Sequence, residues 1–143
     1  MTIDDYMKAL ELDEGFRGRP YYCPSDALSI MYGRNLDANP FTEEEGRFIL
    51  GRDVRRIEAE MSAFFGPDLW NTIGDWRRVA LVNMRYQLGR SGFRGFRKMI
   101  SAVRAKDWKM AAAEAADSKW ADQTVLRSER VVTALADNVN TWS

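Results

Sequence analysis

The chain has 143 residues, the usual size of one folded domain, and its 21 lysines and arginines balance 21 aspartates and glutamates. A formal net charge of zero provides no overall field to recruit nucleic acid or an anionic membrane, so any binding of a polyanion has to be local. The absence of histidine and the single cysteine exclude a histidine-based triad, a histidine zinc site and an internal disulfide. Acid–base chemistry near neutral pH therefore has to rest on carboxylates, the thiol or water.

The first element that the sequence predicts is a short amphipathic helix. Thr2 has the chemistry of an N-cap, Asp5 stands at the third position after it, and apolar residues recur on one face. This pattern predicts a helix over residues 2–12 that stops near Gly15.

A small antiparallel sheet is expected next. Between residues 15 and 40 the helical period disappears, and glycine, proline, serine, aspartate and asparagine interrupt two short runs, Tyr21–Tyr22 and Leu28–Tyr32. The two runs predict the strands of a hairpin.

The rest of the chain predicts helices. Thr42 and Glu45 form a capping box, and behind it apolar residues recur every three or four positions, at Leu50, Val54, Ile57, Met61 and Phe64. The first four of these residues should line the core side of a long amphipathic helix. Four more helices are expected over residues 75–88, 92–104, 107–116 and 124–138.

These elements predict an α+β fold that is mostly helical, with a small N-terminal antiparallel β lobe, a long connecting helix and a C-terminal helical bundle. The expected boundaries are about 13–40 for the β lobe, 42–64 for the interlobe helix and 67–143 for the helical lobe, which helix 2–12 should join. We expect residues 1–143 to form a single domain.

Glu14 lies where the first helix ends and the sheet begins, a junction at which clefts form. Taken singly, each candidate has an ordinary explanation: Glu14 as an exposed carboxylate, Cys23 as a small buried apolar residue, Ser29 as a surface hydroxyl and Arg127 as a solvated charge. Their spacing is more informative, because Glu14 is followed by Cys23 and then by Ser29 in the pattern Glu, eight residues, Asp or Cys, five residues, Thr or Ser.

This pattern resembles the signature of the phage-type, T4-lysozyme-like lysozymes and endolysins of glycoside hydrolase family 24. The resemblance extends through "LDEGFRGRPYYCP", "LSIMYGRNLD" and "TEEEGRFILGRDV" to three blocks of the helical lobe, "RRVALVNMRYQLG", "GFRGFRKMISAVRAKDWKMAA" and "SKWADQTVLRSERV". It covers most of residues 7–132.

The resemblance implies roles for the three residues of the pattern. Glu14 becomes the general acid that protonates a glycosidic oxygen, Cys23 occupies a position that often holds an aspartate, and Ser29 matches a threonine that helps to hold the attacking water. A neutral thiol is a poorer base than a carboxylate, so Cys23 reads as a tolerated variant. Two further departures from the family pattern are Met31 and a residue near Asp26. The family usually has glycine at these positions.

The resemblance also implies supporting and substrate-binding residues. Arg127 matches the arginine that pairs with the catalytic glutamate, and Arg34 and Asp53 match a pair that joins the lobes. The resemblance implies that Gln87, Gln123 and Thr124 bind the sugars. Trp120 is expected in the core.

The implied function is that of an endolysin, a muramidase that hydrolyses the β-1,4 bond between N-acetylmuramic acid and N-acetylglucosamine in peptidoglycan. We expect a monomer without cofactor or metal that binds murein glycan strands, binds no nucleic acid and does not insert into membranes. With no leader or anchor in this sequence, it is expected in the host cytoplasm until a holin-type permeabiliser admits it to the periplasmic wall. The alternative is a weak or inactive peptidoglycan-binding relative.

Overall fold

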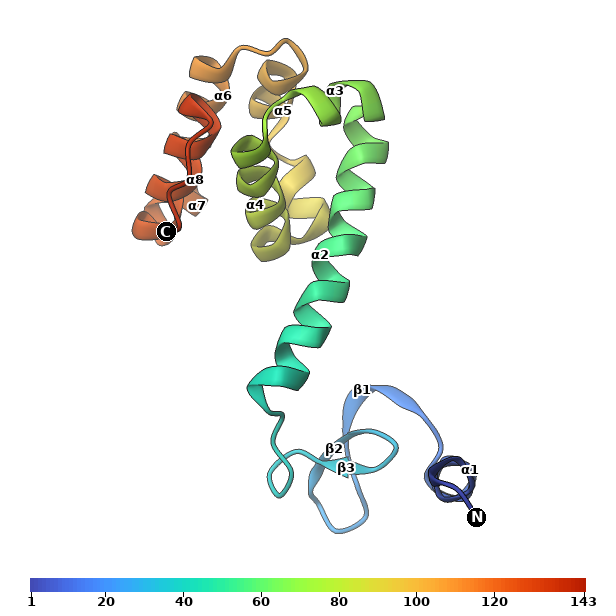
Figure 1. Cartoon of the computed structure of the whole chain (residues 1–143). Coiled ribbons are helices and arrows are strands. Elements are labelled where there is room, and N and C mark those ends of the chain that lie inside the picture. Colours follow the sequence, from blue (N-terminus) through green and yellow to red (C-terminus); the bar gives the residue numbers. More distant parts are fainter. The chain divides into compact units, whose positions relative to one another are not determined.

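The computed structural model describes all 143 residues, and its contacts divide the chain into two units, Met1–Ile49 and Leu50–Ser143, which we describe separately. The elements in chain order are α1 (Ile3–Glu14), β1 (Arg17–Tyr22), β2 (Leu28–Met31), β3 (Arg34–Asn35), α2 (Glu43–Phe65), α3 (Pro67–Thr72), α4 (Asp75–Arg94), α5 (Arg97–Arg104), α6 (Trp108–Ala116), α7 (Lys119–Gln123) and α8 (Val125–Asp137) (Figure 1). The predicted α+β class, with one small antiparallel sheet, is confirmed.

Helix α1 begins and ends at the predicted signals. The carboxylate of Asp5 accepts hydrogen bonds from the backbone N–H of Thr2 at 2.7 Å and from its hydroxyl at 3.1 Å. At the other end Gly15 takes a positive φ of 66° and donates its N–H to the carbonyl of Glu11 at 3.0 Å. A residue without a side chain adopts this conformation at no steric cost, so the helix ends immediately after Glu14.

The sheet has the order β1-β2-β3 with antiparallel pairing throughout. Tyr21 pairs with Ser29 and Tyr22 with Leu28, and the register shifts between Arg17 and Tyr21. The sequence predicted the first two strands, but β3 is only two residues long and carries no alternation from which it could be recognised.

Helix α2 starts at the predicted capping box, in which the N–H of Glu45 donates to the hydroxyl of Thr42 at 3.2 Å and the carboxylate of Glu45 accepts from Thr42 in return. Ile57 and Met61 are buried in the core of the second unit, as expected. Leu50 and Val54 were expected in the core too, but they line a groove on that unit.

The second unit is a helical bundle around one apolar core. Its largest buried side chains include Trp70, Phe93 and Met84, and α8 packs against both α4 and α6. Gly89, with a φ of 75°, interrupts α4, and the short helices α3 and α7 had not been predicted. Whether residues 2–12 pack with this bundle concerns both units and stays a prediction.

None of the helices combines the length and the apolar character that crossing a lipid bilayer requires. No three cysteine, aspartate or glutamate side chains are grouped as ligands for a metal ion.

A nearly buried ion pair ties α2 to α4. Arg85, which is 8% exposed, places its Nε 2.5 Å from Oε2 of Glu60 and a terminal nitrogen 3.3 Å from Oε1. This hydrogen bond from Arg85 lowers the pKa of Glu60 against the opposing effect of burial, and the charges of Arg85 and Arg90 act in the same direction. The pair therefore supplies the carboxylate with a charge partner inside the helical unit.

We predict that Glu60→Gln lowers the free energy of unfolding at pH 7 by about 2–4 kcal/mol, because Arg85 then loses its counter-ion. The folded-state pKa of Glu60 is lowered, so its stabilising effect is present above the ordinary carboxyl pKa and is lost as the pH falls through the lowered value. The difference in the free energy of unfolding between wild type and Glu60→Gln, measured by urea unfolding, should therefore shrink towards pH 3. Glu58→Gln, on an exposed side chain of the same helix, is the control. Equal stability of wild type and Glu60→Gln at pH 7 would contradict this account.

Candidate active site

The carboxylate of Glu14 lies directly against the turn between β2 and β3. A Cβ placed on Gly33, the glycine of that turn, would overlap an oxygen of the Glu14 side chain. Gly33 also has a φ of 67°, a conformation that residues with side chains rarely adopt. The turn thus needs glycine for two reasons, its backbone conformation and the close approach of the carboxylate.

The rings of Phe16 and Tyr32 lie with their centroids 5.5 Å apart, and they come from the two segments that Glu14 and Gly33 also occupy. Both side chains remain exposed, Phe16 at 64% and Tyr32 at 46%, so this contact between the end of α1 and the turn lies at the surface. The prediction that Glu14 lies at a junction of helix and sheet is confirmed.

Cys23 directly follows β1 and Ser29 lies in β2, and both contact the carbonyl of Ala27 in the turn between these strands. The Sγ of Cys23 is 2.9 Å from the Oγ of Ser25, and the Cys23 N–H donates to the carbonyl of Ala27 at 2.9 Å. Ser29 is 2% exposed and donates its hydroxyl to that same carbonyl at 3.2 Å. The sequence had suggested a surface hydroxyl for Ser29 on its own, and the burial contradicts that reading.

The pKa of the Cys23 thiol is lowered, first by the hydrogen bond with the Ser25 hydroxyl and next by a backbone hydrogen bond at Ala27, with a smaller contribution from Ser29. At a given pH, Cys23 therefore carries more thiolate than an ordinary cysteine.

Arg34 is held within the first unit. It donates to the carbonyls of Asn39 at 3.0 Å and Pro40 at 3.1 Å, and one of its terminal nitrogens lies 3.6 Å from the carboxylate of Glu45. Asp53, in the second unit, lies 3.3 Å from Arg56. The pair of Arg34 with Asp53 would join the two units and stays a prediction.

Arg127 lies in an apolar groove of about 560 Å³ on the second unit. Its Nε donates to Oδ1 of Asn83 at 2.8 Å, and a terminal nitrogen donates to the Asn83 carbonyl at 3.2 Å. Asn83 thus fixes the direction of the guanidinium, a contact that no pattern in the sequence had indicated. The pairing of Arg127 with Glu14 involves both units and stays a prediction.

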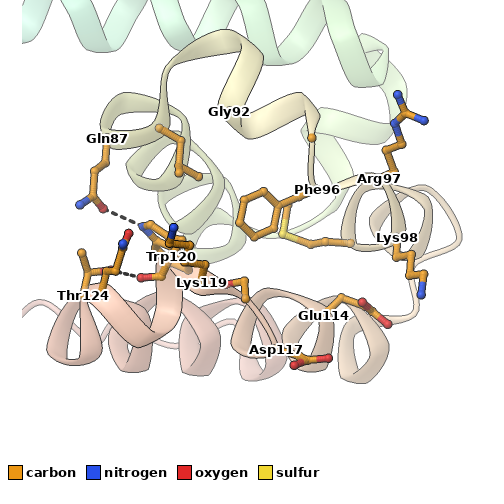
Figure 2. Close-up of a pocket in the computed structure, with 15 residues that line it drawn as sticks. Gln87, Gly92, Phe96, Arg97, Lys98, Glu114, Asp117, Lys119, Trp120 and Thr124 are labelled. Carbon is orange, nitrogen blue, oxygen red and sulfur yellow. Dashed lines mark hydrogen bonds between the residues drawn. The ribbon is translucent and has the colours of Figure 1, made fainter.

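The three predicted sugar-binding residues, Gln87, Gln123 and Thr124, line one cavity of about 840 Å³ in the second unit (Figure 2). Trp120, 6% exposed, donates its indole N–H to Oε1 of Gln87 at 2.8 Å, and the hydroxyl of Thr124 donates to the Trp120 carbonyl at 2.8 Å. Trp120 engages only Oε1 of Gln87. The side-chain amide N–H groups of Gln87 therefore remain available to a ligand.

Trp120 therefore does more than fill the core, which was its expected place. It also holds one side chain of the cavity by a hydrogen bond and a second through its backbone. The sequence offered one signal for this role, since a buried tryptophan usually finds a partner for its N–H. The partner itself could not be identified, because Gln87 is 33 residues away.

Comparison with known proteins identifies the family of the chain. Residues 11–137 match the family model described as phage lysozyme, so the chain belongs to that family.

Among curated proteins, the chain is 34% identical over 108 residues to the pre-baseplate central spike protein Gp5 of Enterobacteria phage T4, covering 73% of this chain and 19% of that protein. It is 37% identical over 91 residues to the probable T4-type lysozyme 2 of Dictyostelium discoideum, covering 64% of this chain and 53% of that one. A probable T4-type lysozyme 1 of the same organism is 30% identical over 67 residues, 47% of this chain and 39% of the relative. The chain thus spans about half or less of the length of these relatives.

Two residues near the site have backbone conformations that favour glycine. Met31, the last residue of β2, has a φ of 57°, and Asp26, in the turn before β2, has a φ of 65°. These are the positions at which the sequence departs from the family's usual glycines. Aspartate tolerates the left-handed region better than methionine does, so the strain falls mainly on Met31.

We predict that Met31→Gly is more stable than Met31→Ala by about 1 kcal/mol, because both remove the side chain but only glycine relieves the positive φ. At Ile30, whose φ is not positive, the order should reverse, with alanine the better replacement. Urea unfolding of the four variants tests this directly. If alanine were equal to or better than glycine at Met31, the strain would not exist.

Proposed function

We propose that the chain is a glycoside hydrolase that cleaves the β-1,4 bond between N-acetylmuramic acid and N-acetylglucosamine in bacterial peptidoglycan. The observation that carries the proposal is the carboxylate of Glu14, held at the end of α1 against Gly33 in a chain whose residues 11–137 match phage lysozymes. The two Dictyostelium relatives are described as probable T4-type lysozymes.

In the proposed reaction Glu14 gives its proton to the glycosidic oxygen as the bond to the leaving sugar breaks. Because Gly33 has no side chain, the carboxylate can lie directly against the backbone at that residue. Water then adds to the sugar cation. The side chains of Ser29 and Cys23 position this water, in the roles that the family gives to a threonine and an aspartate respectively. The raised thiolate fraction of Cys23 suits it to accept the proton of that water.

The glycan is proposed to bind along the cavity of Gln87, Gln123 and Thr124, whose amides and hydroxyl match the N-acetyl and hydroxymethyl groups of the sugars. Arg127, directed by Asn83, is proposed to orient Glu14. Arg34 and Asp53 are proposed to support the approach of the two lobes.

Biologically, we propose an endolysin that degrades the cell wall and lyses the host of a phage. In this proposal a monomer stays in the bacterial cytoplasm until a holin-type protein opens the membrane, and then acts on the periplasmic wall.

A specific observation favours a second function, a peptidoglycan-binding relative with weak or no turnover. Cys23 and Ser29 place no carboxylate on the water side of the site, and Met31 adds backbone strain to the adjacent strand. In that case the cavity would bind glycan strands without cleaving them.

Glu14→Gln distinguishes the two functions. The amide keeps the shape of the side chain but has no acidic proton, so the release of reducing ends from purified sacculi should fall by a factor of about a hundred or more. Binding to sacculi should be retained. Glu11→Gln, on the same helix one turn earlier, should cleave like the wild type. Equal release by wild type and Glu14→Gln would remove Glu14 from the mechanism, and a wild type that binds but releases nothing would favour the second function.

Cys23→Asp tests the thiol's role. An aspartate is ionised at pH 7, so it should act as a base at least as well as the thiol, and the rate should stay the same or rise. Cys23→Ala should be slower than either. A folded Cys23→Asp protein without activity would show that the thiol itself takes part, for example as a nucleophile.

A further inference from the structure

The turn that follows β1 has a defined backbone geometry. The N–H of Asp26 donates to the carbonyl of Cys23 at 2.8 Å, and the N–H of Cys23 donates to the carbonyl of Ala27 at 2.9 Å. Pro24 stands directly after Cys23, where its fixed φ favours a turn, and Asp26 closes the loop with a φ of 65°. The backbone on both sides of Ser25 is therefore held in place by hydrogen bonds.

This turn brings the hydroxyl of Ser25 to the thiol of Cys23. Its Oγ lies 2.9 Å from the Sγ of Cys23, which is the hydrogen bond that the Ser25 side chain makes. A thiolate has no proton to give, so when Cys23 is ionised the hydroxyl has to be the donor. Ser25 is exposed and Cys23 is partly exposed, so water can reach the sulfur from its other side.

The two serines near Cys23 differ in what they can still offer. Ser29 is 2% exposed, and its hydroxyl donates to the carbonyl of Ala27 at 3.2 Å. Since a hydroxyl has one proton, Ser29 can accept a hydrogen bond from a water molecule but has little left to give to the sulfur. The pKa of the Cys23 thiol reflects this difference, because the hydrogen bond from Ser25 is the largest cause of its lowering and the one from Ser29 is the smallest of those identified.

Charged groups around the turn do not replace this hydrogen bond. Asp26 shares the turn, Tyr21–Tyr22 precedes it on β1, and β2 has no titratable side chain. Arg34 of β3 is already engaged by two carbonyls and by the carboxylate of Glu45. None of these groups forms a hydrogen bond with the thiol, so the Ser25 hydroxyl is the side chain that decides how much thiolate is present.

We propose that Ser25 is a positioning residue of the hydrolysis, whose hydroxyl donates to the Sγ of Cys23, keeps this sulfur ionised and directs it at the attacking water. The inference rests on the proposed function, in which Cys23 accepts the proton of that water. A cysteine is mostly protonated at pH 7 unless its surroundings stabilise the thiolate, so the base at this position depends on its donor.

The protons balance in this scheme. Glu14 gives its proton to the leaving oxygen as the glycosidic bond breaks. The water oxygen forms a bond to the anomeric carbon, and the proton it loses converts the Cys23 thiolate to the thiol. Ser25 keeps its own proton throughout, and exchange with solvent returns Glu14 and Cys23 to their starting states.

The first test measures the thiol without any catalysis. Cys23 is the one cysteine of the chain, so the rate of alkylation by iodoacetamide as a function of pH reports its pKa directly. Ser25→Ala should raise this pKa, and Ser25→Thr, which keeps the hydroxyl, should restore it towards the wild-type value. Asp26→Asn is the matched control, since it removes the charge of the same turn, tolerates the positive φ and should not raise the pKa. Circular dichroism checks that each variant is folded.

The second test follows the release of reducing ends from purified sacculi. A base with a raised pKa loses its active form at a higher pH, so the acidic limb of kcat/KM in Ser25→Ala should move upward together with the pKa of the thiol. At pH 7 the rate should fall by about twofold to tenfold, the usual effect of one lost hydrogen bond. In a Cys23→Asp protein, whose carboxylate is ionised at pH 7 without a donor, the same change should cost much less activity.

An unchanged thiol pKa in Ser25→Ala would overturn the proposal. So would a raised thiol pKa with an unmoved acidic limb, or an equal loss of activity with cysteine and with aspartate at position 23, which would show a purely structural role for Ser25. Failure of the proposed function would look different, because the wild type would then release no reducing ends although Ser25→Ala still raised the pKa of the thiol.

Discussion

The candidate chemistry depends on one steric constraint, the contact between the Glu14 carboxylate and the backbone of Gly33. It requires that α1 end abruptly, which Gly15 provides, and that the turn before β3 present bare backbone, which Gly33 provides at a φ of 67°. A side chain at position 33 would displace the carboxylate. Misplacement of a catalytic group by about 1 Å can cost on the order of a hundredfold in rate, so the proposed role of Glu14 makes the conformation of both glycines relevant to activity.

In the helical unit, hydrogen bonds orient functional side chains. Two side chains of functional interest are directed by hydrogen bonds to a neighbour: Arg127 by Asn83, and Gln87 by the buried indole of Trp120. The pair of Glu60 with Arg85 connects α2 to the helix that carries Asn83 and Gln87. Side chains oriented in this way lose less freedom when a ligand binds, which is the physical value of a rigid helical platform.

Local signals in the sequence predicted much of this, and distant contacts account for what it did not predict. The two capping boxes, at Thr2 and at Thr42, lie within four residues of chain and were confirmed. Leu50 was placed in the core because periodicity identifies an apolar face without showing what covers it, and the structure has it in a groove. The meeting of Glu14 with Gly33, and of Trp120 with Gln87, depends on tertiary packing that no spacing rule encodes. The site residues themselves came from family resemblance.

The central claim is the bond that the enzyme breaks, and the products identify it most directly. Purified sacculi are digested with the wild-type chain, the soluble fragments are reduced with borohydride, and mass spectrometry determines which sugar has become an alcohol. The account predicts muramitol at the new ends, formed by the wild type and not by Glu14→Gln. Glucosaminitol at those ends, or fragments without any reduced sugar, would contradict it.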